Sequence, residues 1–349
     1  MKLKIKMLNA FNGDSFLISI NENNETKNII VDGGIRKTYA RELRDEIKRI
    51  IKRNENIDLM FITHVDDDHI GGIISFFEDN EIDKSIVKRV LFNSANTISN
   101  TLKTQYDPNR EIPINKITDK KVSYNQGKTL EQELLNYDLL EKNIIKVGTS
   151  INIGSAKIKI LSPRDIDIEK LDKKWTREAS YKRKVSSVKN DYDKYIEDLI
   201  INDTYDKDKS IVNISSISFL LEFGEFKILM LADTRSDIIT KSLNDLGYNK
   251  ENKLSVDYVK LPHHGSCNNL FYDLLEIISC RRYIISTDGS IFNHPDKRTL
   301  ARILNSFSDV EFYFNNHLYN DIFLEGDKQK YKFKCIEQKL LELDNERDI

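Results

Sequence analysis

Cysteine and long apolar runs are both scarce in this sequence. The 349 residues include only three cysteines, and no two of them have CxxC spacing, so no disulfide framework is expected. No apolar run approaches the roughly 18 residues of a membrane-spanning helix. Lysines interrupt the opening segment MKLKIKMLNAF, which is unlike a secretory signal. We therefore expect a cytoplasmic protein without a membrane partner.

A strong charge of either sign is also absent. Lysine and arginine together number 54, against 56 aspartates and glutamates, which gives a net charge of −2. The molecule as a whole therefore does not attract a polyanion, and any contact with nucleic acid must rely on a local basic patch. Hydrophobic residues make up 39% of the chain, enough to fill the core of one large domain or two smaller ones.

Strand-like and helix-like segments alternate along both halves of the chain. Residues 3–34 follow a strand–turn pattern, a helix is predicted over 38–53, and IDLMFIT is typical of a buried strand. The second half holds two hairpins and three short strands, with helices predicted at 236–246, 268–279 and 297–306. Two such halves predict an α/β (α+β) fold, in which two sheets pack face to face with helices outside.

One highly charged stretch lacks this pattern. Residues 164–211 show no strand periodicity and are predicted to be helical. We interpret them as an insertion or lid within a single domain that spans residues 1–335. Residues 336–349 are predicted to form a C-terminal tail.

The six histidines are unevenly placed. None lies between His69 and His263, and five of the six follow predicted strands, in the loops THVDDDH, PHHG and FNHP. Loops at strand ends can converge on one rim of a sheet, where ligands commonly bind. We therefore expect a shared site, with His317 outside it as an ordinary surface residue. For His294, a role in the site and an ordinary loop position are both open.

The segment THVDDDHIGG predicts a metal site. Imidazole and carboxylate groups are ligands that divalent ions prefer, and alternation in a tight loop points His64, Asp66 and Asp68 to the same side. His69 adds a fourth donor. Together with later ligands these are more donors than one ion can use, so two ions are expected. Asp67 falls between the alternating positions and is interpreted as a solvated residue.

This segment resembles the HxHxDH metal-binding signature of the metallo-β-lactamase superfamily. With Asp66 at the second ligand position, it is similar to the extracytoplasmic hydrolase domain of the DNA-uptake protein ComEC and to teichoic-acid phosphorylcholine esterases. Further segments resemble that branch in the same order: LNAFNGDSFLI, IIVDGG, FKILMLADT, LPHHGS and NHP. The resemblance implies a four-layer αββα hydrolase domain.

The resemblance also implies roles for particular residues. Asp233 would bridge two metal ions, and Asp32 would support the ligands from behind. One histidine of PHHG would be a ligand. We favour His263, which is nearer the strand end, and expect His264 to contact the phosphate or protonate the leaving oxygen. The implied metal ligands are His64, Asp66, Asp68, His69, Asp233 and His263.

Some features depart from the family pattern. A histidine normally precedes the strand that leads to the bridging aspartate, but Asn213 stands near that position. Either its carbonyl oxygen binds metal or water fills the place. The membrane helices of ComEC are absent, so a DNA-channel role is not supported. Aspartate at the second ligand position makes the site harder, which favours Mn²⁺ while leaving Zn²⁺ open.

The implied activity is that of a metal-dependent phosphodiesterase, a nuclease in the first instance. Two divalent ions would activate a water that bridges them, and Asp68, His264 and His294 would have catalytic roles. Lys297 and Arg298 are either phosphate contacts or the basic start of a helix. The alternatives are a phosphodiesterase for a small substrate (a cyclic nucleotide or phosphocholine ester) and a non-catalytic metal-bound module in a multi-protein complex.

A basic segment lies within the predicted insertion. Residues 170–189 hold eight lysines and arginines against two acidic residues, and they include the only tryptophan of the chain. Such a segment can hold a nucleic-acid backbone and stack a base. A solvated helix with Trp175 packed on the body, or a surface for a partner protein, accounts for the same pattern. The candidate contacts to DNA or RNA are Lys173, Lys174, Trp175, Arg177, Lys182, Arg183 and Lys184.

Overall fold

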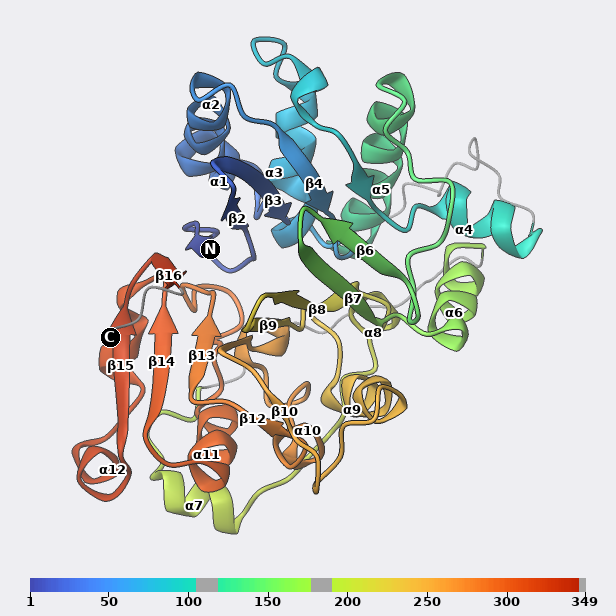
Figure 1. Ribbon diagram of the computed structural model, residues 1–349. Helices are drawn as coiled ribbons and strands as arrows, with labels where there is room; N and C mark the ends of the chain where they lie inside the picture. Colours follow the sequence, from blue (N-terminus) through green and yellow to red (C-terminus); the bar gives the residue numbers. More distant parts are fainter. Residues whose placement is uncertain (105–118, 177–189, 345–349) are drawn as a thin grey trace.

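Two β-sheets lie at the centre of the protein, and helices cover their outer sides (Figure 1). The structure is a computed structural model that describes residues 1–104, 119–176 and 190–344, without the side chains of 119–125 and 175–176. Within these ranges, no helix combines the length and apolarity needed to cross a membrane. The α/β four-layer arrangement predicted from the sequence is confirmed.

The first sheet has six strands in the order β16–β1–β2–β3–β4–β5. The strands from β16 to β3 pair antiparallel, whereas β4 and β5 continue parallel to β3. Their bounds are β1 (Lys2–Met7), β2 (Phe16–Glu22), β3 (Glu25–Val31), β4 (Ile57–Phe61), β5 (Val90–Leu91) and β16 (Leu340–Asp344).

The second sheet has eight strands in the order β15–β14–β13–β11–β9–β8–β7–β6. Pairing is parallel from β15 to β9 and antiparallel from β9 to β6. Strands β10 (Leu254–Ser255) and β12 (Ile278–Ser279) form a separate small pair. The bounds in the large sheet are β6 (Ser150–Ile153), β7 (Ala156–Ser162), β8 (Ser218–Phe223), β9 (Phe226–Met230), β11 (Tyr258–Lys260), β13 (Arg282–Ile285), β14 (Val310–Phe314) and β15 (Phe333–Glu337).

Apolar side chains fill the space between the two sheets. In β4, Leu59 and Phe61 belong to this central core, while Met60 belongs to the core under the outer helices. Phe61 stacks on Phe219 of β8, with their ring centroids 4.5 Å apart. Because both faces of such strands are buried, their sequences are continuous apolar runs, as in IDLMFIT.

Helices form the two outer layers (Figure 1). Their amphipathic pattern determines which side is buried: Ile47 and Ile50 of α2 are fully buried under the first sheet. The helix predicted at 268–279 is only the short α10, and the chain then enters β12. The covering helices are α2 (Arg44–Lys52), α3 (Asp67–Glu78) and α5 (Asp119–Asn136) on the first sheet, and α9 (Ser236–Asp245), α10 (Tyr272–Leu275) and α11 (Lys297–Ser306) on the second.

The predicted insertion is packed into both halves of the fold. It contains α6 (Asp165–Thr176) and α7 (Ile196–Ile201), and it ends in irregular chain where α8 (Ile211–Ile214) begins. Leu171 of α6 belongs to the outer core of the first sheet, and Leu199 of α7 belongs to that of the second. The segment is therefore helical in part, and its described residues are anchored on both sides of the molecule.

The C-terminal residues complete both sheets, so the predicted tail over 336–349 is wrong for residues 336–344. Strand β15 runs to Glu337 at the edge of the second sheet. Strand β16 then pairs with β1 in the first sheet, with Leu341 opposite Ile5. Leu341 is 1% exposed, and its burial between the sheets is the physical reason for the difference.

Substitution of Leu341 tests whether β16 is an integral strand. Leu341→Ala should lower the free energy of unfolding by about 2–5 kcal/mol, because it removes buried methyl groups and leaves a cavity. Leu340, its neighbour, is 40% exposed, and Leu340→Ala should cost less than about 1 kcal/mol. Urea unfolding followed by circular dichroism measures both values. Equal losses in the two variants would contradict the position of β16.

Candidate metal centre

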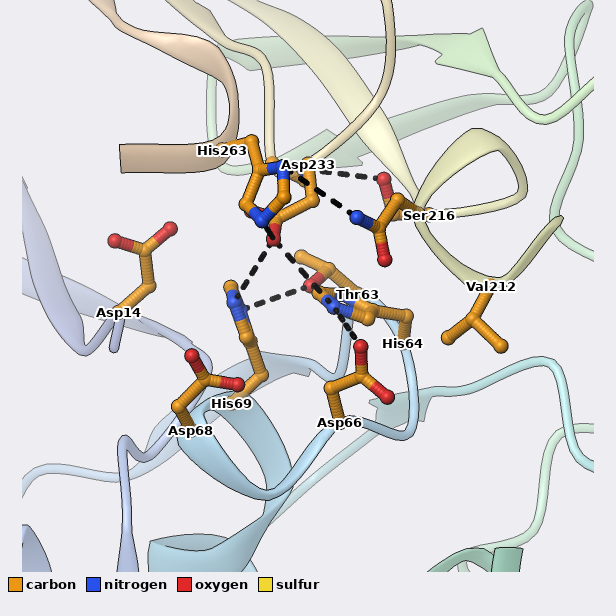
Figure 2. Close-up of polar contacts among 12 residues, drawn as sticks. Asp14, Thr63, His64, Asp66, Asp68, His69, Val212, Ser216, Asp233 and His263 are labelled. Atoms are coloured by element: carbon orange, nitrogen blue, oxygen red, sulfur yellow. Dashed lines mark hydrogen bonds and ion pairs between the residues drawn. The ribbon is translucent and has the colours of Figure 1, made fainter. Parts of the chain in front are cut away.

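Loops that follow β4, β9 and β11 meet at one rim of the two sheets, where the β1–β2 loop joins them (Figure 2). The loop after β4 leads directly into α3, so its last two site residues lie in the first turn of that helix. The side chains brought together are Asp14, His64, Asp66, Asp68, His69, Asp233, His263 and His264.

Asp233 occupies the middle of this group. Its Oδ2 lies 3.5 Å from Nε2 of His69, 3.7 Å from Nε2 of both His64 and His263, and 3.8 Å from Nε2 of His264. These distances exceed those of ordinary hydrogen bonds. Four imidazole nitrogens therefore surround one carboxylate oxygen without forming ordinary hydrogen bonds to it.

Close backbone contact holds α3 against the end of β3. The amide of Gly33 donates to the carbonyl of His69 (2.8 Å), and the amide of Gly72 donates to that of Gly34 (2.8 Å). A Cβ atom on Gly72 would lie 2.0 Å from the carbonyl oxygen of Gly33, so only glycine fits there. This contact places Asp32, the residue before Gly33, directly behind the imidazole of His69.

The histidines direct Nδ1 away from the centre. Nδ1 of His69 lies 2.8 Å from Oδ2 of Asp32, and Nδ1 of His264 lies 2.9 Å from the carbonyl oxygen of Ser286. Both partners act as acceptors, so each Nδ1 carries the proton and each Nε2 presents its lone pair to the centre. Such outward hydrogen bonds are typical of histidines that bind metal.

Asp32 also orients the third imidazole. Thr63 Oγ1 donates to Oδ2 of Asp32 (2.7 Å), and it therefore accepts the proton of His64 Nδ1 at 3.0 Å. The amide of Thr63 donates to Oδ1 of Asp32 (2.8 Å). Asp32 is fully buried, and it lies behind the ligands as the resemblance implied.

The atoms that face the centre are buried, and some have no hydrogen-bond partner within the described chain. Unpaired buried polar atoms are costly, and imidazole lone pairs beside carboxylates form the donor set of a divalent metal site. The donor set therefore fits divalent metal ions. Ligand atoms that all lie within 4.8 Å of one another come from Asp14, His69, Asp233 and His264. The unpaired atoms are Nε2 of His64, His69 and His264, and Oδ1 of Asp14 and Asp233.

The charges at the centre shift the pKa values of its histidines in opposite directions. Burial, together with the neighbouring His69, lowers the pKa of His64 to about 4. Burial alone would also lower the pKa of His69, but the carboxylates of Asp233 and Asp32 outweigh it and hold this pKa well above the usual value. The pKa of Asp233 lies well below its usual value despite burial, because histidines surround the carboxylate.

The three adjacent aspartates have different partners, and Figure 2 shows Asp66 and Asp68 beside the histidines. Oδ2 of Asp66 lies 3.8 Å from Nε2 of His64, and Oδ2 of Asp68 accepts a hydrogen bond from Asn12 (3.0 Å). Asp67 instead accepts a hydrogen bond from Gln126 of α5. Two of the three carboxylates therefore lie at the centre, and the middle one is held by a helix outside it.

Sequence comparison supports the predicted superfamily for the N-terminal part of the chain. Residues 8–130 match the model of the metallo-β-lactamase superfamily. The match spans roughly a third of the chain, contains Asp14, Asp32 and the whole HVDDDH segment, and supports the predicted superfamily. The ComEC-like branch stays a prediction. No curated protein sequence matches the chain.

Distant likenesses to solved structures extend over nearly the whole chain. One is Zn²⁺-bound PqqB from Methylobacterium extorquens, at 8% identity and a TM-score of 0.45, covering 98% of this chain and 99% of that one. Another is the metallo-β-lactamase fold protein YhfI from Bacillus subtilis, at 8% identity and a TM-score of 0.43, covering 98% and 99%. A diphosphatase of the PhnP family has 11% identity and a TM-score of 0.42, covering 98% of each chain. Likenesses this distant carry no inference about function.

Both histidines of PHHG face the centre of this site. Nε2 of His264 lies 3.7 Å from Oδ2 of Asp68, and the side chain is 1% exposed. We expected His264 to contact a phosphate or the leaving group. That prediction is wrong, because such burial leaves no access for a substrate. His263, the expected ligand, has a 14% exposed side chain and also directs Nε2 to Asp233.

Asn213 lies behind the ligands. Its side-chain amide donates to Oδ2 of Asp208 (2.7 Å), and its carbonyl oxygen accepts from the hydroxyl of Ser210 (3.1 Å). The alternative in which this carbonyl oxygen binds metal is therefore wrong.

His294 lies at the rim, with its ring centroid 5.3 Å from that of His263 and Nδ1 3.6 Å from Asp296. Burial lowers the pKa of His294.

Two predicted phosphate contacts are engaged elsewhere. Lys297 is fully buried, pairs with Asp327 at 2.6 Å and donates to the carbonyl of Lys194 at 2.6 Å. Arg298 pairs with Asp203 at 3.2 Å. Both predictions are corrected: these side chains tie the start of α11 to neighbouring segments. His317 is 82% exposed beside Glu337, as expected of a surface residue.

The predicted nucleic-acid contacts fall only partly on described residues. Lys173 and Lys174 lie in the last turn of α6, where Lys173 is exposed and Lys174 is half-buried. Arg177, Lys182, Arg183, Lys184 and the side chain of Trp175 lie outside the described residues. The basic segment therefore stays a prediction.

Two site residues were not predicted. Asp14 lies among the buried ligand atoms. Lys260, 1% exposed, pairs with Asp14 and donates to the carbonyl of Ala232 (3.2 Å). The signals that could have found them are the polar NGD after β1 and a single lysine inside the apolar run VDYVKLP.

The three aspartates provide a test with a built-in control. Asp66→Asn and Asp68→Asn should each reduce the number of ions that the protein retains, because an amide is a weaker ligand than a carboxylate. Asp67→Asn should retain the wild-type number, because Asp67 bonds to Gln126 outside the centre. Mass spectrometry of metal content after desalting measures the number of ions. Loss of metal in Asp67→Asn alone would contradict the geometry.

Proposed function

We propose that this protein is a metal-dependent hydrolase that cleaves phosphodiesters, with nucleic acid as substrate. The observation that carries the proposal is the ring of four imidazole Nε2 atoms around Oδ2 of Asp233. With two further carboxylates beside it, this ring provides enough donors for two divalent ions, Mn²⁺ or Zn²⁺. The residues that would hold them are His64, Asp66, Asp68, His69, Asp233, His263 and His264.

Two bound ions would supply Lewis acidity, lowering the pKa of water and neutralising the negative charge of a phosphodiester. The protein itself provides orientation. Asp32 holds the imidazoles of His69 and His64, and the Ser286 carbonyl holds that of His264. Because all these groups are buried, little reorganisation is needed when charge develops on the substrate.

His294 is placed to meet the substrate. Its imidazole lies beside His263 at the rim, and its side chain is 14% exposed, whereas His64, His69 and His264 are 3% exposed or less. A partly accessible imidazole at the rim can donate a hydrogen bond to a phosphate oxygen or a proton to the leaving oxygen. We therefore propose a catalytic role for this side chain.

Nucleic acid is favoured by the basic segment over residues 170–189. Eight lysines and arginines in 20 residues contrast with a chain whose net charge is only −2. Charge concentrated in one segment is how a nearly neutral protein binds a phosphate backbone. We also propose that the protein is cytoplasmic and that the same segment can bind a protein partner.

A small phosphodiester is the second candidate substrate. A narrow pocket opens beside His64, and it is lined by Leu171 of α6, in the predicted insertion, and by Val212 of α8. Thr63, Asn93 and Ser215 contribute polar groups. These polar groups beside the metal centre support a compact substrate, such as a cyclic nucleotide, which would bind outside the pocket because the pocket has room for only about one water molecule.

Cleavage assays distinguish the two substrates. The protein loaded with Mn²⁺ or Zn²⁺ should cleave single- or double-stranded DNA or RNA, and EDTA should abolish cleavage. Reversing the charge of Lys182, Arg183 and Lys184 together should lower cleavage of nucleic acid at least about tenfold, because each lost phosphate contact weakens binding. Hydrolysis of bis-p-nitrophenyl phosphate should be unchanged in that variant.

Two results would count against the proposal. Absence of any phosphodiester cleavage by protein that retains both ions would contradict the hydrolase. Hydrolysis of small phosphodiesters alone, unaffected by charge reversal, would replace nucleic acid by the second candidate substrate.

A further inference from the structure

We propose that His263 takes the place of the histidine that the family pattern has near position 213, and that Asp208 is the positioning residue that directs the His263 imidazole to the metal centre. The inference rests on the proposed metal centre. It assigns a role in that centre to a residue of the charged segment 164–211 that sequence patterns give no reason to single out.

Asn213 does not supply the ligand that the family pattern has near its position, so another imidazole is needed at the metal centre. Its amide nitrogen is directed to Asp208 (2.7 Å), and its carbonyl oxygen receives the hydroxyl of Ser210 (3.1 Å). The same amide nitrogen lies 3.4 Å from Nδ1 of His263. Asn213 therefore stands behind the ring of His263, and His263 is the side chain between it and Asp233.

The backbone of PHHG is shaped to present both of its histidines. His263 and His264 have φ values of 46° and 56°, in the left-handed region that residues with a side chain rarely adopt. Two such residues in a row persist only where surrounding contacts fix them. The amide of His263 donates to the carbonyl of Ala232 (2.9 Å), which ties the turn to the residue before Asp233.

The two imidazoles then serve different sides of Asp233. Nε2 of His264 lies 3.7 Å from Asp68, and its ring centroid lies 5.3 Å from that of His69. His263 instead adjoins α8, the helix that also lines the pocket beside His64. One ion would therefore have Asp68, His69 and His264, and the other would have His64, Asp66 and His263, with Asp233 shared.

Asp208 is fixed behind His263 by a dense set of contacts. Its Oδ2 accepts hydrogen bonds from Asn213 (2.7 Å) and Asn269 (3.2 Å) and lies 3.5 Å from Nδ1 of His263. Its backbone amide donates to the carbonyl of Asn268 (3.0 Å), and its own carbonyl accepts from Arg235 (3.0 Å).

A carboxylate behind a histidine is a recognised device for metal binding. It keeps the proton on Nδ1, leaves the Nε2 lone pair for the ion and makes the imidazole more basic. Nδ1 of His263 also lies 3.1 Å from the side-chain oxygen Oδ1 of Asn269, so its nearest neighbour is an acceptor, closer than the amide nitrogen of Asn213 at 3.4 Å.

Asp208 is the carboxylate behind His263, at 3.5 Å from its Nδ1, a longer contact than the 2.8 Å hydrogen bond between Asp32 and His69. Asp208 also accepts a hydrogen bond from Asn269 (3.2 Å), whose side-chain oxygen faces the same Nδ1, so it orients His263 by its charge and through Asn269.

Counting bound Zn²⁺ tests the proposal. Full-length protein is loaded with Zn²⁺, desalted and analysed by mass spectrometry, and affinities are measured by competition with a chromophoric chelator. The wild type should retain two ions. Asp208→Asn should weaken one site about 10–100-fold, as loss of such a partner typically does, and His263→Ala should retain one ion. Asp206→Asn is the matched control, because Asp206 is 79% exposed two residues away.

The outcomes separate this inference from the proposed function. Wild-type affinity for both ions in Asp208→Asn, or two ions in His263→Ala, would overturn the inference. If Asp208→Asn does not fold, as judged by the thermal melting of the metal-free protein, His263→Ala carries the test with Asp208 intact. Wild-type protein that binds two ions but cleaves no phosphodiester would contradict the proposed function and leave the inference standing.

Discussion

The burial of several carboxylates around one point is the constraint on which the site depends. A buried charge is stable only when an opposite charge or hydrogen-bond donors accompany it. Within the described chain, Lys260 is the ammonium group at this point, and it pairs with Asp14 alone. The remaining negative charge, together with imidazole lone pairs aimed at Asp233, requires cations. The fold brings these groups together because strands of both sheets end at the same rim.

Backbone packing converts this electrostatic requirement into geometry. Gly33 and Gly72 allow β3 and α3 to approach closely enough for Asp32 to hold His69. The left-handed turn of PHHG brings in the two remaining histidines from the second sheet. Each side of Asp233 thus receives ligands from both halves of the molecule, so metal binding and the packing of the two sheets support one another.

Local spacing in the sequence predicted much of the site and of the two sheets. HVDDDH and PHHG were identifiable because their ligands are sequence neighbours, and apolar alternation gave the two sheets. Long-range contacts were beyond it: Lys297 adjoins His294 in sequence, yet its helix turns it toward Asp327. Strand β16 was mistaken for a tail because its segment is short and charged, and only pairing with β1 makes it a strand. Asp208 looked like one more acidic residue among many.

The central claim, that two ions share Asp233, is tested most directly by anomalous diffraction. Crystals grown with Mn²⁺ or Zn²⁺ and measured on both sides of the metal absorption edge would show the number and position of the ions. Two peaks should flank Oδ2 of Asp233, one in contact with His64 and the other with His264. A single peak, or peaks away from Asp233, would contradict this claim.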